Sequence, residues 1–133
     1  TERQFTDAVI DKARAHGWLC YHASTSMRMV RRKNTLTGDP EYFHVGDADS
    51  RGFPDLVLVR INPILHFGEM IVAELKVGKN KPDEGQYAWL SIFKEIGAMS
   101  SESGSPVGAL SVHPVRVYVW YPSDMPHIEE VLR

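Results

Sequence analysis

The order of hydrophobic and polar positions predicts a chain of short strands and amphipathic helices. Residues 55–60 and 70–77 are two apolar runs rich in branched aliphatic side chains, a pattern typical of strands buried inside a sheet. Residues 18–22 alternate apolar and polar positions over a shorter stretch, and residues 115–121 form a fourth run of the same kind. We therefore expect four strands that share one sheet.

Helical periodicity fills three segments between and around these strands. Residues 2–16 place side chains at helical spacing on one face, and Gly17 suits the end of the helix; the face comprises Glu2, Phe5, Val9 and Ala13. Residues 82–96 predict a second helix that ends at Gly97. Its inward stripe comprises Gln86, Trp89, Leu90, Phe93 and Ile96. Residues 123–132 predict a short third helix.

The resulting order, α-β-β-β-α-β-α, predicts an α/β fold with a central mixed β-sheet flanked by helices. At 133 residues, the chain has the length of a single domain, 1–133, with a substantial core. Residues 24–51 show no periodicity and are expected to form a long loop or an inserted hairpin, and residues 100–106 form a loop rich in Ser, Gly and Pro.

Composition narrows the class of protein. Hydrophobic residues make up 43% and charged residues 24%, which is ordinary for a globular domain. The single cysteine, Cys20, excludes an internal disulfide and fits a reducing compartment. No apolar stretch reaches membrane-spanning length, and the first residues lack the apolar core of a signal peptide. We expect a cytoplasmic protein without a membrane partner.

The charge distribution points to local rather than global attraction of polyanions. The net charge is −2, so binding to nucleic acid would depend on basic patches. One patch lies in a stretch without acidic residues until Asp39, and comprises Arg28, Arg31, Arg32 and Lys33. A second patch comprises Lys76, Lys79 and Lys81.

The candidate chemistry centres on three charged residues within or beside the apolar runs: Asp55, Glu74 and Lys76. Side chains alternate along a strand, so Glu74 and Lys76 share one face. Two carboxylates can hold a hard divalent cation, and a neighbouring lysine can act on a water, as metal-assisted phosphodiester hydrolysis requires. The simpler alternatives are a solvated Glu–Lys pair where the strand reaches the surface, and turn chemistry at Asp55.

Two polar residues at the starts of apolar helical faces are further candidates. Glu2 either places a favourable charge in the first turn of a helix or reaches the site of Asp55 and Glu74. Gln86 is either an amphipathic boundary position or a member of the same site.

The motif Pro54-Asp55, Glu74-Leu75-Lys76 and Gln86 on the following helix resembles the PD-(D/E)XK nuclease signature. The sequence around this motif is similar to one branch of these nucleases, the VRR-NUC domains, which are often small stand-alone proteins of phages and prophages. The similar segments are Gly52-Phe53-Pro54-Asp55-Leu56, Gln86-x-x-Trp89-Leu90, Val119-Trp120-x-Pro122-x-Asp124, Glu2-x-x-Phe5, Gly17-Trp18-Leu19 and Tyr21-His22. A phage-encoded protein would act in the host cytoplasm.

This resemblance implies a restriction-endonuclease-like fold and Mg²⁺- or Mn²⁺-dependent DNA cleavage. Asp55, Glu74 and the backbone carbonyl of Leu75 would be metal ligands, and Glu2 would complete the metal shell directly or through water. Lys76 would orient or deprotonate the attacking water and stabilise charge on the phosphate. Gln86 would hydrogen-bond Lys76 or a substrate phosphate.

The resemblance also implies a DNA partner and a homodimer. Stand-alone members are similar to Holliday-junction resolvases, so branched DNA is the expected substrate. Backbone phosphates would be neutralised by Arg28, Arg31, Arg32, Lys33, Arg51, Lys79 and Lys81. The stretches 26–46 and 99–113 appear as insertions and are candidate dimer surfaces. The alternatives are a sequence-specific or nicking endonuclease with the same site, and a catalytically silent DNA-binding protein.

Overall fold

The computed structural model describes residues 1–23, 28–33, 35–45, 51–102 and 115–133. The helices are α1 (Glu2–Ala15), α2 (Glu84–Glu102) and α3 (Met125–Leu132), the last preceded by a 3₁₀ turn over Pro122–Asp124. The strands are β1 (Leu19–His22), β2 (Arg28–Lys33), β3 (Pro40–Val45), β4 (Leu56–Ile61), β5 (Gly68–Leu75) and β6 (Arg116–Trp120). The order predicted from the sequence is therefore confirmed, with one hairpin, β2–β3, inserted after the first strand.

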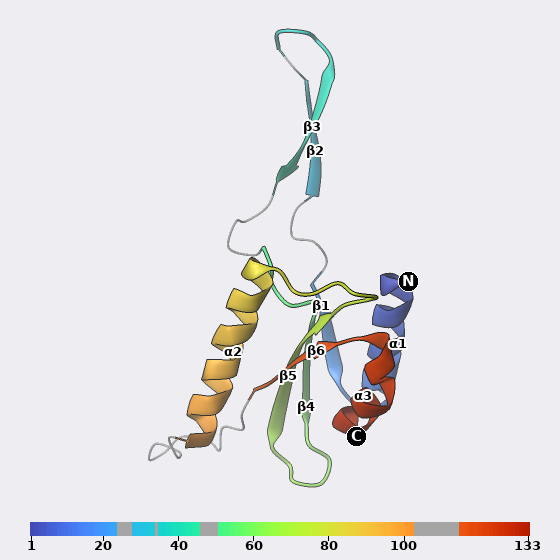
Figure 1. Cartoon of the computed structure of the whole chain (residues 1–133), viewed down its shortest axis with the longest axis vertical. Helices are drawn as coiled ribbons and strands as arrows, with labels where there is room; N and C mark the ends of the chain where they lie inside the picture. The colour runs from blue at the N-terminus through green and yellow to red at the C-terminus, as the bar shows by residue number, and fades with distance from the viewer. Residues whose placement is uncertain (24–27, 34, 46–50, 103–114) are drawn as a thin grey trace.

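The central sheet has four strands in the order β1-β4-β5-β6. Strand β4 pairs antiparallel with both β1 and β5, whereas β5 pairs parallel with β6. The parallel pair requires a crossover, which α2 supplies. Figure 1 shows α1 and α3 on one side of the sheet and α2 on the other. The prediction of a mixed sheet flanked by helices is confirmed.

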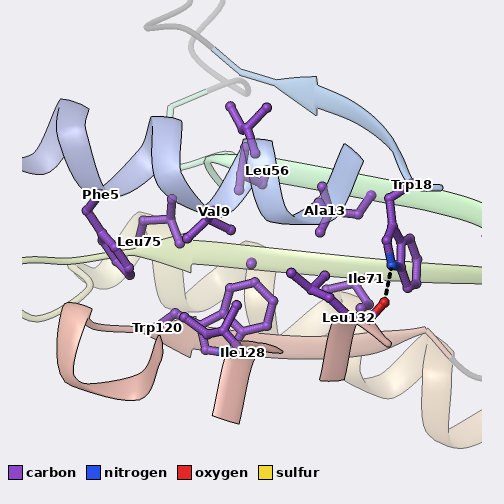
Figure 2. Packing of buried hydrophobic residues seen from close by; sticks show 13 residues of the cluster. Phe5, Val9, Ala13, Trp18, Leu56, Ile71, Leu75, Trp120, Ile128 and Leu132 are labelled. Atoms are coloured by element: carbon purple, nitrogen blue, oxygen red, sulfur yellow. Dashed lines mark hydrogen bonds between the residues drawn. The ribbon is translucent and has the colours of Figure 1, made fainter. Parts of the chain in front are cut away.

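The main core lies between the sheet and the pair α1 and α3. Phe5, Val9 and Ala13 of α1 are buried, as their helical spacing predicts, and they pack against alternate residues of β5 (Figure 2). Trp120 and Ile128 close the core from β6 and α3. The indole N–H of Trp18 donates to the Leu132 carbonyl over 2.9 Å, which fixes the start of β1 to the end of α3.

Helix α1 begins and ends as its sequence predicts. The Thr1 hydroxyl accepts from the Gln4 N–H, and Gln4 bonds back to the Thr1 amino group, which closes a capping box. Gly17 follows the helix with φ +85°, a conformation that residues with a Cβ adopt at a cost. Glu2 is exposed in the first turn, so the buried stripe begins at Phe5 and the prediction that Glu2 belongs to it is wrong.

Helix α2 differs from the prediction at its C-terminal end. It continues through Gly97 to Glu102, and Gly97 is buried where α2 passes the start of β6. A Cβ at Gly97 would overlap the carbonyl of Val115, so glycine here permits close packing rather than ending the helix. Ile96, expected on the inward stripe, is 46% exposed.

The segment 24–51 contains the hairpin β2–β3, one of its two expected forms. These strands make a separate two-stranded sheet with an antiparallel register from Arg28 opposite Val45 to Lys33 opposite Pro40. Figure 1 shows the hairpin projecting from the end of the central sheet at which α2 begins. No described helix is both long enough and apolar enough to cross a membrane.

Candidate functional site

The strand register brings the two predicted carboxylates together. Because Leu56 of β4 pairs with Ala73 of β5, Asp55 stands across from Glu74 at the end of the two strands. Asp55 Oδ2 accepts from the Leu75 N–H over 2.8 Å, and Glu74 Oε2 accepts from the Asp55 N–H over 3.2 Å. The two side chains are thus fixed against each other by backbone donors.

Glu74 is the centre of the cluster. Its side chain is 1% exposed, and its Oε1 atom accepts from Gln86 Nε2 over 2.7 Å and lies 3.2 Å from Lys76 Nζ. Lys76 and Glu74 share a face, as the alternation of the strand predicts, and Lys76 is 16% exposed. With the Asp55 N–H, three donors surround this one carboxylate, which offsets part of the cost of burying it.

The surroundings of Glu74 disfavour the ionised form of its carboxylate. Burial is the main cause, and the negative charge of Asp55 adds to it; together they raise the pKa of Glu74 to about 7, although Lys76 acts in the opposite direction. A second positive charge at this point would favour the ionised carboxylate. The pair formed by buried Glu74 and half-buried Asp55 therefore has the electrostatic character of a cation site.

The turn before β4 is held on the first turns of α2. Gly52 has φ +80°, and a Cβ there would lie 2.7 Å from the Gln86 backbone nitrogen. The Trp89 indole N–H donates to the Arg51 carbonyl over 3.2 Å. The Phe53 ring packs edge-on against Trp89, with centroids 5.0 Å apart. These contacts set the direction in which the chain enters Asp55.

The start of α2 positions Gln86. Asp83 Oδ1 accepts from the Gln86 N–H over 2.9 Å, and Gln86 Oε1 accepts from the Asp83 N–H over 2.8 Å, which forms a reciprocal cap. The remaining amide nitrogen of Gln86 is then directed at Glu74. The sequence-based hypothesis paired Gln86 with Lys76 or a phosphate, whereas the structure shows it bonded to the carboxylate.

The segment after β5 carries three basic residues, Lys76, Lys79 and Lys81. The Lys76 N–H donates to the Trp120 carbonyl over 2.9 Å, which continues the pairing of β5 with β6 by one residue. The Tyr121 hydroxyl donates to the Asn80 carbonyl over 2.8 Å. Lys79 and Lys81, on either side of Asn80, are exposed. Their loop is therefore anchored to the end of β6 beside the carboxylates.

The other predicted site residues are placed as follows. Glu2 is exposed and is not grouped with Asp55 and Glu74 in the described part of the chain. Arg51 and Lys33 are exposed. Arg28, Arg31 and Arg32 belong to β2, but their side chains lie outside what the structure describes, as do residues 103–114 of the second insertion.

The sequence interpretation named several of these residues but missed Asp83 and the contacts by which they support the site. Asp83 and Gln86 have the spacing of a capping box, which is a recognisable signal for the start of a helix. Gly52 carried no such signal, because its role depends on how closely α2 approaches it. The contact of Phe53 with Trp89 likewise joins segments more than thirty residues apart.

The donor set suits a hard cation in type, since carboxylate oxygens are the ligands that Mg²⁺ and Mn²⁺ favour. Across the residues with described placement, no three His, Cys, Asp or Glu side chains form a metal-binding group, so the acidic side chains of this cluster are Asp55 and Glu74. Comparisons with protein-family models, with curated proteins and with solved structures found no match.

Proposed function

We propose that the protein is a divalent-metal-dependent DNA endonuclease of the PD-(D/E)XK type, similar to stand-alone VRR-NUC domains. One observation carries the proposal: Asp55, Glu74, Lys76 and Gln86 converge at one end of the sheet, with Glu74 held by donors from three directions. The solvated-pair alternative for Glu74 and Lys76 loses support, because Glu74 is 1% exposed.

The fold is compatible with this proposal. A mixed four-stranded sheet stands between helices, and the crossover helix α2 follows the strand that carries Glu74. The restriction-endonuclease-like assignment rests on the same order of elements together with the sequence motif. Helix α2 contributes Gln86 from its first turn, which places a polar group over the end of β5.

A metal ion would be held by the carboxylates of Asp55 and Glu74, with the Leu75 carbonyl as the further ligand that the motif implies. When bound, Mg²⁺ or Mn²⁺ would act as a Lewis acid toward the scissile phosphate and an attacking water. The raised pKa of Glu74 supports this choice, because a buried carboxylate beside a second acid favours a shared cation.

The protein's own groups then have separate tasks. Lys76, held 3.2 Å from Glu74, is placed to stabilise negative charge on the phosphate or to orient a water. Gln86 positions the Glu74 carboxylate rather than touching the reacting atoms. Lys79 and Lys81, exposed on the anchored loop beside the site, would contact backbone phosphates of the DNA.

A homodimer with a preference for branched DNA forms part of the proposal. One site cuts one strand, whereas resolving a four-way junction needs two symmetric cuts, which a two-fold dimer supplies. An exposed apolar face of the central sheet is a further candidate dimer surface. Leu19 pairs with Val59 across β1 and β4, and these residues are 72% and 38% exposed. Tyr21 and Ile61 extend the same face and are 63% and 67% exposed.

The experiment that tests the function is cleavage of a panel of linear, flap and four-way-junction DNAs with Mg²⁺ or Mn²⁺. Metal-dependent cutting that prefers junctions supports the full proposal. Cutting that follows sequence favours the restriction-type or nicking alternative. Binding without cutting under any metal condition would favour a silent DNA-binding protein and refute the nuclease proposal.

A further inference from the structure

The chain leaves the body toward the inserted hairpin, and returns from it, beside the candidate site. The Ala23 N–H, directly after β1, donates to the Asp55 carbonyl over 2.9 Å. On the return side, the Arg51 carbonyl accepts from the Trp89 indole over 3.2 Å. The hairpin leaves the body at this end of the sheet (Figure 1). A ligand bound near the base of the hairpin would therefore lie at the end of the sheet that carries Asp55 and Glu74.

The hairpin has the shape of a free ribbon. Strands β2 and β3 each have six residues and pair along their whole length, which gives a ribbon about 20 Å long. The two strands form a sheet of their own, separate from the central one. An isolated hairpin is marginally stable in water, so such a ribbon gains from a partner. The major groove of B-form DNA admits a two-stranded ribbon of this kind.

The register gives the ribbon two chemically different faces. One face places Arg31 opposite Tyr42 and Lys33 opposite Pro40, and contains no acidic residue; its positions are Met29, Arg31, Lys33, Pro40, Tyr42 and His44. The other face includes one acidic residue, Glu41, at the register position opposite Arg32. Its positions are Arg28, Val30, Arg32, Glu41, Phe43 and Val45.

The charge of the hairpin selects the class of partner. Residues 28–45 contain four of the fifteen Lys and Arg residues and two of the seventeen acidic residues, so the segment carries +2 and the remainder −4. The acid-free face has Arg31 and Lys33 among its positions and no acidic residue to offset their charge. Phosphate and base edges are the better complement.

We propose that the β2–β3 ribbon enters the major groove of a B-form DNA duplex next to the cleaved phosphate, with its acid-free face toward the DNA. The inference rests on the proposed function and deepens it by naming the substrate element, a DNA duplex arm. Double-stranded RNA has a deep and narrow major groove that does not admit the ribbon, so DNA duplexes are preferred to RNA duplexes.

The test is metal-free DNA binding combined with dimethyl sulfate footprinting, which reports guanine N7 in the major groove and adenine N3 in the minor groove. The wild-type chain protects guanine N7 and binds duplex DNA at least about tenfold more tightly than duplex RNA. The double variant Arg31→Ala with Lys33→Ala loses the N7 protection and about tenfold in affinity. The matched double variant Arg28→Ala with Arg32→Ala removes equal charge from the other face and retains the protection.

Several outcomes would overturn the inference. Equal losses in the two double variants would show that charge alone matters and not the face. Protection of adenine N3 alone would move the contact to the minor groove, and a change in molar mass in the first variant would assign the ribbon to contacts between copies. In each case metal-dependent cleavage by the wild-type chain can persist, so failure of the inference is separable from failure of the nuclease proposal.

Discussion

The Glu74 carboxylate accepts a hydrogen bond of 3.2 Å from the Asp55 N–H, across two neighbouring antiparallel strands. Asp55 in turn bonds the residue that follows Glu74, the N–H of Leu75, over 2.8 Å. Each acid is thereby oriented by the backbone of the other acid's strand. Rigid backbone donors hold the two carboxylates in a fixed relation before any cation binds, as precise metal or phosphate chemistry requires.

The turn that leads into Asp55 depends on Gly52. We expect Gly52→Ala to lower the free energy of unfolding by about 3 kcal/mol or more, because its Cβ meets the backbone of Gly85 and Gln86 and its φ is positive. Gly78→Ala is the matched control, since Gly78 also has positive φ, +61°, but nothing lies within 4 Å of an added Cβ. The free energy of unfolding should fall by only about 1 kcal/mol in Gly78→Ala. Equal losses in urea denaturation would refute the packing role of Gly52.

Gln86 and Asp83 form one cap but contact Glu74 differently. Removing either side chain should cost about 1 kcal/mol of stability through loss of the cap. Gln86→Ala should also lower kcat about tenfold to a hundredfold and raise the metal concentration needed for half-maximal activity, because Glu74 loses its 2.7 Å partner. Asp83→Ala should leave the metal requirement unchanged, because it keeps the backbone N–H of residue 83 that holds Gln86 Oε1. The same metal requirement in both variants would contradict a positioning role for Gln86.

The raised pKa of Glu74 predicts a pH dependence of the metal-free fold. Unfolded Glu74 loses its proton near 4.5 and folded Glu74 near 7, so its contribution to stability is full below pH 4.5 and is lost as pH rises through 7. The loss is on the order of 3 kcal/mol. Lys12 and His16 lower the pKa of Glu129 to about 2. The contribution of Glu129 to stability therefore changes only below pH 4.5, outside the range in which Glu74 titrates.

The measurement is urea denaturation in EDTA between pH 4.5 and 8, with Glu74→Gln as the reference. As pH rises, the wild type should lose stability relative to Glu74→Gln. Added Mg²⁺ should restore the lost stability of the wild type. A difference that is flat across this range would show that Glu74 titrates normally.

The apolar face of β1 and β4 predicts the dimer surface. The wild-type chain should have the molar mass of a dimer at micromolar concentration, and Leu19→Asp or Ile61→Asp should convert it to a monomer, because a charge would be buried in the interface. Ile64→Asp is the control, since Ile64 is 80% exposed in the turn between β4 and β5. A wild-type monomer, or dissociation by the control alone, would reject this surface.

The sequence predicted the parts of the fold that local patterns specify. Branched aliphatic runs identified β4 and β5, and the spacing of Phe5, Val9 and Ala13 identified the buried side of α1. Alternation correctly placed Lys76 beside Glu74. Each of these follows from residues close together in the chain, for which periodicity is a sufficient guide.

The errors arise where distant segments meet. Gly97 was predicted to end α2, because glycine often follows the last turn of a helix. In the structure it instead gives room to the carbonyl of Val115, and this contact with a residue far along the chain leaves no local signal. The hydrogen bond from Gln86 to Glu74 was not predicted, because the direction of the Gln86 side chain depends on its cap with Asp83 and on the position of β5. Glu2 was expected in the buried stripe, but the first turn of α1 extends beyond the sheet-covered core.

The most direct measurement of the central claim is single-turnover cleavage of a four-way-junction DNA by the wild type and by Asp55→Ala, Glu74→Ala and Lys76→Ala. We expect cleavage with Mg²⁺ or Mn²⁺, none with EDTA, and a rate loss on the order of a thousandfold or more in each variant. Lys94→Ala, which removes an exposed lysine from α2, should cleave at the wild-type rate. Robust cleavage in EDTA, or a fully active Glu74→Ala, would contradict the account.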